Sequence, residues 1–185
     1  SEVYGEPVHL PQNEETTPLN SRLPYAIAKN VGESYFKSYY QEFGLNYTIF
    51  RFFNTYGPDQ SKDFVMSRFI DSALNNDDII IYGDGNQTRT FCYIDDNIDA
   101  TMAAMNSDSA INSVFNIGND IIVTINELAE TIIRLTNSKS KIKHIAALEE
   151  GDMTRRQPDI TKMKALLKRE LKSLEAGIVA LLEQK

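Results

Sequence analysis

A tyrosine and a lysine lie four residues apart in the stretch LPYAIAKNVGESYF, residues 23–36. On a helix, this spacing puts Tyr25 and Lys29 on one face, about one turn apart. A free phenol has a pKa of about 10, and a fixed positive charge beside it favours the phenolate. Such a phenolate can take a proton from a hydroxyl while a hydride leaves the same carbon for an oxidised nicotinamide. The alternative is a tyrosine on a buried helix face beside a solvated lysine, and the spacing alone does not decide between the two.

The other reactive side chains offer weaker candidates. The single cysteine, Cys92, lies in the alternating pattern RTFCYI with neither histidine near it in sequence, so we predict a small core residue and not a nucleophile. One cysteine cannot form an internal disulfide, which fits a reducing, cytoplasmic compartment. His9 and His144 have no partners at metal-ligand spacing, and we predict no metal site.

Size, charge and hydropathy narrow the classes of partner. The 185 residues are enough for one sizeable domain, and a net charge of −7 argues against a general nucleic-acid binder. A small anionic ligand is still compatible with this charge if a few arginines converge. No apolar run approaches the roughly 20 residues that cross a bilayer, so we expect no membrane partner. The chain starts without a methionine or a signal-peptide pattern, and we expect it to be an internal piece of a longer protein.

Strand and helix patterns alternate along the chain, which predicts an α/β fold. A helix should run from about Pro24 to Phe43 and stop at Gly44, because apolar residues recur there at three- and four-residue steps. The other expected helices cover residues 64–76, 95–106 and 124–137, with two more between 159 and 184. The expected strands are a strand end at 1–5, then 46–53, 78–83, 88–94 and 113–118.

Local signals refine these elements. Asp95 or Asp96 is the expected N-cap of its helix, in preference to a pair of catalytic carboxylates. The Thr-x-x-Glu spacing of Thr124 and Glu127 predicts a capping box. No glycine-rich turn of the Gly-x-Gly-x-x-Gly kind follows a strand, since the glycines of YGDGNQ lead into another strand. By itself, the chain therefore shows no dinucleotide-binding half.

Six segments resemble the extended short-chain dehydrogenase/reductase family, in its nucleotide-sugar branch of epimerases, dehydratases and decarboxylases. They occur in the family's order and span essentially the whole chain: SEVYG, PYAIAK, RFFNTYGP, IIIYGDGNQTRTFCYIDD, FNIG and RRQPDITKMKALL. The resemblance implies the last strands of a Rossmann-type parallel sheet and a smaller C-terminal substrate-binding domain. Residues 1–58 would then end the NAD-binding domain, with the Tyr25 helix, and residues 59–185 would form mainly the substrate domain, some segments returning to the sheet.

The resemblance also implies roles for individual residues. Tyr25 is similar to the family's catalytic base, and Lys29 to its partner, which also holds the nicotinamide ribose; both would contact the cofactor NAD. The family's catalytic Ser or Thr would directly precede Ser1. Glu2 occupies the position of an acid in dehydratases and decarboxylases, and a solvated strand end is the alternative for it.

Substrate contacts follow in the same way. Asn54 resembles the residue that contacts the substrate diphosphate, with a plain turn asparagine as the alternative, and Thr55 lies where the loop passes the cofactor. Arg89 resembles the arginine that grips this diphosphate, and an exposed strand arginine is the weaker alternative. Arg156 resembles a second such arginine, with Arg155 as the neighbouring choice. Planar guanidinium groups bind phosphate oxygens bidentately, which makes two arginines chemically reasonable.

The implied function is NAD-dependent modification of a UDP-sugar or other nucleoside-diphosphate sugar through a 4-keto intermediate. Glu2 and the RRQPDITKMKALL ending favour a UDP-glucuronate decarboxylase, whereas YAIAKNVGE is more typical of an epimerase, and a 4,6-dehydratase is a further alternative. The tail also lacks the family's common Trp-x-Pro. The family further implies a homodimer through the Tyr25 helix. A different class of protein, a non-catalytic sugar-nucleotide-binding or dimerising module, is the other alternative, and we expect the 185-residue chain alone to be inactive.

Overall fold

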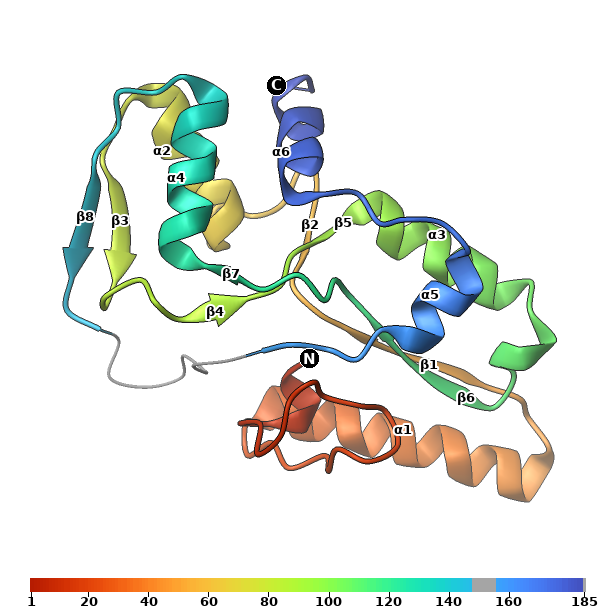
Figure 1. Cartoon of the computed structure of the whole chain (residues 1–185). Helices are drawn as coiled ribbons and strands as arrows, with labels where there is room; N and C mark the ends of the chain where they lie inside the picture. Colours follow the sequence, from red (N-terminus) through yellow and green to blue (C-terminus); the bar gives the residue numbers. More distant parts are fainter. Residues whose placement is uncertain (148–155, 185) are drawn as a thin grey trace.

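The computed structural model describes residues 1–147 and 156–184 (Figure 1). Within these ranges, helices alternate with four two-stranded sheets, three of them parallel and one antiparallel. The predicted α/β class is confirmed. No helix in the described part of the chain is both long enough and apolar enough to span a membrane.

The first group of elements surrounds a parallel strand pair. Strand β1 (Thr48–Phe52) pairs with β6 (Ser113–Ile117) over five residues of each strand. Figure 1 shows α1 (Pro24–Phe43) on one side of this pair, and α3 (Ile94–Met105) with α5 (Thr161–Leu167) on the other. The short helix η2 (Asp108–Ala110) leads into β6. Apolar side chains between the pair and α3 and α5 form a small core of their own: Cys92, Ala100, Ala104, Phe115, Ile117, Ile160 and Met163.

Helix α1 has the predicted bounds. Pro24 lies in its first turn, where a missing N–H costs nothing, and Gly44 ends it in the left-handed conformation at φ 67°. The predicted strand end at residues 1–5 is wrong. Glu2–Tyr4 form a 3-10 turn, η1, in which the backbone N–H of Gly5 donates to the carbonyl of Glu2. Strand β1 pairs with β6 and not with this segment.

The second group encloses the largest core. It contains α2 (Val65–Asn75), β3 (Ile79–Tyr82), α4 (Ile125–Thr136), β8 (Ile142–Ile145) and α6 (Leu174–Leu182). Their buried side chains include Met66, Phe69, Ile70, Ile79, Ile81, Leu128, Ile132 and Ile178. Strand β8, which pairs parallel with β3, was not predicted, because Lys143 and His144 break its apolar pattern at an exposed edge.

The segment 88–94, predicted as one strand, is two short strands with different partners. Strand β4 (Thr88–Arg89) pairs antiparallel with β7 (Val123–Thr124), whereas β5 (Cys92–Tyr93) pairs parallel with β2 (Thr55–Tyr56). The chain therefore passes from one strand pair to the other within a few residues. The predicted strand is divided because β4 and β5 pair with different strands, and the local sequence pattern does not encode which strands pair.

The N-terminal ends of α4 and α3 give one confirmed and one wrong prediction. Thr124 and Glu127 form the predicted capping box of α4, each side chain bonding to the other residue's backbone N–H. At α3, Tyr93 occupies the N-cap position instead of an aspartate. Asp95 and Asp96 lie in the first turn of α3, where they form ion pairs with Lys172 and Arg169 of the C-terminal segment. Their carboxylates therefore bind these cations instead of capping the helix.

Candidate active site

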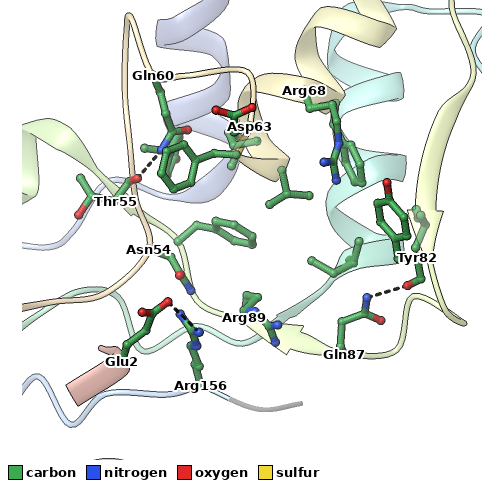
Figure 2. Close-up of a pocket in the computed structure, with 18 of the residues that line it drawn as sticks. Glu2, Asn54, Thr55, Gln60, Asp63, Arg68, Tyr82, Gln87, Arg89 and Arg156 are labelled. Carbon is green, nitrogen blue, oxygen red and sulfur yellow. Dashed lines mark hydrogen bonds and ion pairs between the residues drawn. The ribbon is translucent and has the colours of Figure 1, made fainter. Parts of the chain in front are cut away.

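A cavity of about 660 Å³ opens between the two groups of elements. Its lining residues come from η1, α1, β1, β2, α2, β3, β4, α4 and the segments between them, including the one before α5. Figure 2 shows much of this lining. Most of the candidate residues named from the sequence meet there: Glu2, Tyr25, Asn54, Thr55, Arg89 and Arg156. These residues span 155 positions of sequence, so the fold, not local proximity, brings them together.

Tyr25 and Lys29 lie together on α1. Tyr25 is 64% exposed at the cavity edge, and the Lys29 ammonium lies 5.3 Å from the centroid of its ring. The buried-tyrosine alternative is therefore wrong. Lys29 itself is not among the described residues that line the cavity. The ammonium therefore lies beside the Tyr25 ring, on the same helix and next to the cavity edge.

A second phenol near the cavity has a different character. Tyr56 also lines the cavity, but its ring is almost fully buried. Burial, with electrostatic interactions with Cys92 and Asp96 as smaller causes, raises the pKa of Tyr56 well above its usual value. Tyr56 therefore stays protonated, whereas the Tyr25 ring is exposed at the cavity edge. Burial likewise raises the pKa of the Cys92 thiol to about 12, which agrees with its predicted place in the core.

Glu2 and Arg156 form an ion pair at one end of the cavity (Figure 2). The distance from Arg156 Nη2 to Glu2 Oε1 is 3.4 Å. The Arg156 side chain is 15% exposed, and its Nε atom is buried with no protein partner among the described residues. An incompletely satisfied guanidinium in a cavity is suited to an anionic ligand. The neighbouring choice, Arg155, lies outside the described residues.

Arg89 enters the cavity from β4, beside the Glu2 and Arg156 pair (Figure 2). It is 9% exposed, so the exposed-strand alternative is wrong, and its Nη1 donates to the carbonyl of Thr88 at 2.8 Å. Two guanidinium groups therefore face one cavity. Their combined charge makes this part of the cavity attractive to phosphate oxygens.

Asn54 and Thr55 follow β1 and are held by neighbouring segments. Asn54 Nδ2 donates to the carbonyl of Thr90 at 3.0 Å. Thr55 Oγ1 accepts from Asn97 Nδ2 at 2.7 Å, and its carbonyl accepts from Gln60 Nε2 at 2.8 Å. These contacts hold Asn54 and the start of β2 in place beside the cavity.

The sequence reasoning missed the far end of the cavity, which combines polar and aromatic side chains (Figure 2). Arg68 lies 5.8 Å from the centroid of the Tyr82 ring, and Gln87 Nε2 donates to the Tyr82 carbonyl at 3.0 Å. Further lining residues there are Gln60, Asp63 and Phe64. In sequence, Arg68 is typical of the polar face of an amphipathic helix, so no local signal marks it. In the described ranges, no group of three or more His, Cys, Asp or Glu side chains is arranged to hold a metal ion.

The sequence and the fold are similar to those of known proteins. The model of a family described as the NAD dependent epimerase/dehydratase family matches residues 1–118. UDP-glucuronic acid decarboxylase 5 of Arabidopsis thaliana is 39% identical over 173 residues, covering 90% of this chain and 50% of that protein. UDP-N-acetyl-alpha-D-glucosaminuronate decarboxylase of Bacillus cytotoxicus is 40% identical over 180 residues, covering 90% and 55%.

A solved structure is similar over nearly the whole chain. The UDP-glucose 4-epimerase of Thermotoga maritima, crystallised with UDP-glucose, superposes with a TM-score of 0.89 at 33% identity. The match covers 99% of this chain and 60% of the epimerase. The chain thus spans about half the length of the curated relatives it matches.

Proposed function

Because this chain belongs to the NAD dependent epimerase/dehydratase family, we propose that the full-length protein modifies a nucleoside-diphosphate sugar through a 4-keto intermediate, with UDP-glucuronate decarboxylation as the reaction. The observation that carries the proposal is one cavity containing the Tyr25 phenol, the Glu2–Arg156 pair and Arg89. The two decarboxylases described above support the choice of reaction.

Tyr25 acts as the base in this proposal. Its phenolate takes the proton from the sugar 4-hydroxyl, and the Lys29 ammonium stabilises the negative charge and binds the nicotinamide ribose. Bound NAD supplies the chemistry of accepting the C4 hydride and returning it later. The exposed Tyr25 ring with Lys29 beside it would suit the nicotinamide-ribose end of such a cofactor, and Thr55 lines the same cavity as Tyr25.

Glu2 assists the middle step. Once C4 is a ketone, the carboxylate on C5 can leave as carbon dioxide because the electron pair it leaves behind is delocalised onto the ketone oxygen. A proton then returns to C5, and hydride and proton return to C4. Arg89 and Arg156 would hold the diphosphate, with Asn54 as a further contact, so that the sugar lies between Tyr25 and Glu2.

The assembly and the division of the chain are part of the proposal. Aromatic side chains on α1 remain exposed, with Tyr35 at 63%, Phe36 at 55%, Tyr39 at 51% and Phe43 at 64%. A homodimer through α1 would cover part of this surface. We place residues 1–58 in the NAD-binding domain and 59–185 mainly in the substrate domain. A cytoplasmic location agrees with the single buried thiol.

The test is to incubate the full-length protein with UDP-glucuronate and, separately, with UDP-glucose and a UDP-N-acetylhexosamine. Release of carbon dioxide from UDP-glucuronate alone supports the decarboxylase, and a Tyr25→Phe variant should lose this activity. A changed C4 configuration without loss of mass would establish a 4-epimerase instead, and loss of water a dehydratase. Tight binding of UDP-sugars with no turnover, in the presence of NAD, would favour the non-catalytic module.

A further inference from the structure

A buried arginine outside the cavity anchors the helix that carries Tyr25. Arg51, in the middle of β1, forms a two-pronged pair with Glu33 of α1: Nε to Oε1 at 2.8 Å and Nη2 to Oε2 at 2.7 Å. Both side chains are almost fully buried. Within the described part of the chain, Ala26 and Glu33 are the only buried residues of α1. The Arg51 pair is therefore the main buried polar link between α1 and the sheet.

The same guanidinium also holds the turn that carries Glu2. Arg51 Nη1 donates to the Tyr4 hydroxyl at 2.8 Å and to the Glu14 carbonyl at 3.2 Å. The Arg51 guanidinium also lies 4.9 Å from the centroid of the Tyr4 ring. Tyr4 lies two residues after Glu2 in η1. Burial raises the pKa of Tyr4, so its hydroxyl keeps its proton and donates it to Asn116 Oδ1 at 2.7 Å.

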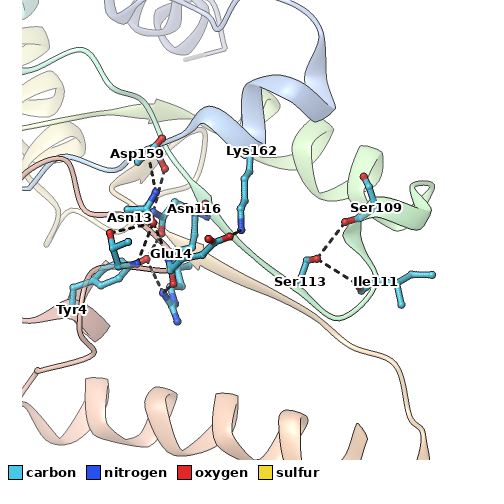
Figure 3. Close-up of polar contacts among 12 residues, drawn as sticks. Tyr4, Asn13, Glu14, Ser109, Ile111, Ser113, Asn116, Asp159 and Lys162 are labelled. Carbon is cyan, nitrogen blue, oxygen red and sulfur yellow. Dashed lines mark hydrogen bonds and ion pairs between the residues drawn. The ribbon is translucent and has the colours of Figure 1, made fainter.

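From Asn116 the network reaches the segment that carries Arg156 (Figure 3). Asn116 Nδ2 donates to the carbonyls of Gln12 at 2.8 Å and Asp159 at 3.2 Å. The backbone N–H of Asp159 in turn donates to the Gln12 carbonyl at 2.8 Å. Asp159 lies three residues after Arg156. Hydrogen bonds thus run without a break from Arg51 to the Arg156 segment.

We propose that Arg51 is a positioning residue that sets the relative placement of the four segments on which Glu2, Tyr25, Asn54 and Arg156 lie. It is joined to the first two segments and, through Tyr4 and Asn116, to the Arg156 segment, and its own strand leads to Asn54. Arg51 is not among the described residues that line the cavity, so it would act through these neighbours. The role in turnover rests on the proposed function, whereas the role in geometry does not.

The chemistry of the network explains why an arginine would be needed. A planar guanidinium can donate two parallel hydrogen bonds to one carboxylate and still donate to two further acceptors. A lysine ammonium keeps the charge but loses this fixed orientation. Misplacement of catalytic groups by about 1 Å can reduce turnover on the order of 100-fold. Small shifts of α1 relative to η1 should therefore appear in kcat.

The test compares Arg51→Lys with the paired variant Arg51→Met/Glu33→Leu in the full-length protein. The paired variant avoids leaving an unpaired buried charge and is expected to fold. We expect kcat for UDP-glucuronate to fall about 10- to 100-fold, KM to change little, and the pH profile of kcat to shift; Arg51→Lys should fall in between. The matched control, Lys62→Gln/Asp71→Asn, removes an exposed pair and should leave all three unchanged.

A folded paired variant with wild-type kcat and pH profile would overturn the proposal. If that variant does not fold, Arg51→Lys decides, and wild-type kcat in it would overturn the proposal equally. A wild-type protein without turnover would refute the proposed function only. In that case, a crystal structure of the folded variant still provides a readout: displacement of α1 relative to β1 and η1 supports the positioning role, and unchanged placement refutes it.

Discussion

Replacement of Glu2 by glutamine should separate binding from turnover in the full-length protein. The substitution keeps the shape of the side chain and removes its charge, so Arg156 loses an ionic partner but not a hydrogen-bonding neighbour. In the free protein, Glu2 competes with an incoming anion for the Arg156 guanidinium, since the two lie 3.4 Å apart. Removing that competition should help an anionic sugar nucleotide to bind while it removes the acid that assists the middle step.

The size of the binding effect follows from the distance and the exposure. Two unit charges 3.4 Å apart attract by about 1.2 kcal/mol in water and by about 5 kcal/mol at an effective dielectric constant of 20. The side chains are 15% and 35% exposed, so screening and desolvation reduce the net value to about 1 kcal/mol. If ligand binding breaks the pair, Glu2→Gln should tighten binding of UDP-glucuronate about 5-fold.

The assay is isothermal titration for the dissociation constant, combined with carbon dioxide release for kcat. Loss of a general acid or base typically costs on the order of 100- to 10,000-fold in rate, so kcat should fall while affinity rises. Glu42→Gln, at an exposed position of α1 outside the cavity lining, is the matched control and should change neither. Weaker binding by Glu2→Gln, or a kcat close to wild type, would refute the assigned role of Glu2.

Three further predictions concern stability and reactivity. A Cβ atom at Gly177 would overlap the Tyr56 hydroxyl and lie 2.8 Å from Tyr56 Cζ, so Gly177→Ala should lower the free energy of unfolding by about 1–3 kcal/mol despite better helix propensity. Adding Tyr56→Phe to Gly177→Ala should restore part of the lost free energy of unfolding, measured by urea denaturation. Additive effects of the two substitutions would contradict this. Because burial raises the pKa of Cys92 to about 12, Ellman's reagent at pH 8 should react only on unfolding, and fast native labelling would disprove its burial. Hydrogen bonding to Thr161 lowers the pKa of Asp159, so its stabilisation is complete above the unfolded pKa near 4 and is lost as pH falls through the folded value. Asp159→Asn should therefore reduce the slope of the free energy of unfolding against pH below about pH 4. An unchanged slope would argue against this role of Asp159.

The sequence alone determined the elements whose signals are local. Helix α1 begins at a proline and ends at a left-handed glycine, and both signals are visible in the sequence. The capping box of Thr124 and Glu127 needs only four consecutive residues. The Tyr25–Lys29 pair follows from helical spacing. The resemblance of six ordered segments to the family extended these local signals to a fold and to six of the residues that line the cavity.

Only the tertiary structure decided which segments meet. It split residues 88–94 between two partner strands, added the exposed strand β8, and paired Asp96 with Arg169, 73 positions away, in place of the expected cap. It also placed Arg68 and Tyr82 at the far end of the cavity. Caps and helical faces depend on neighbours within one or two turns, so the sequence encodes them locally. Strand partners, buried charge pairs and cavity walls depend on contacts between distant segments, which no local pattern specifies.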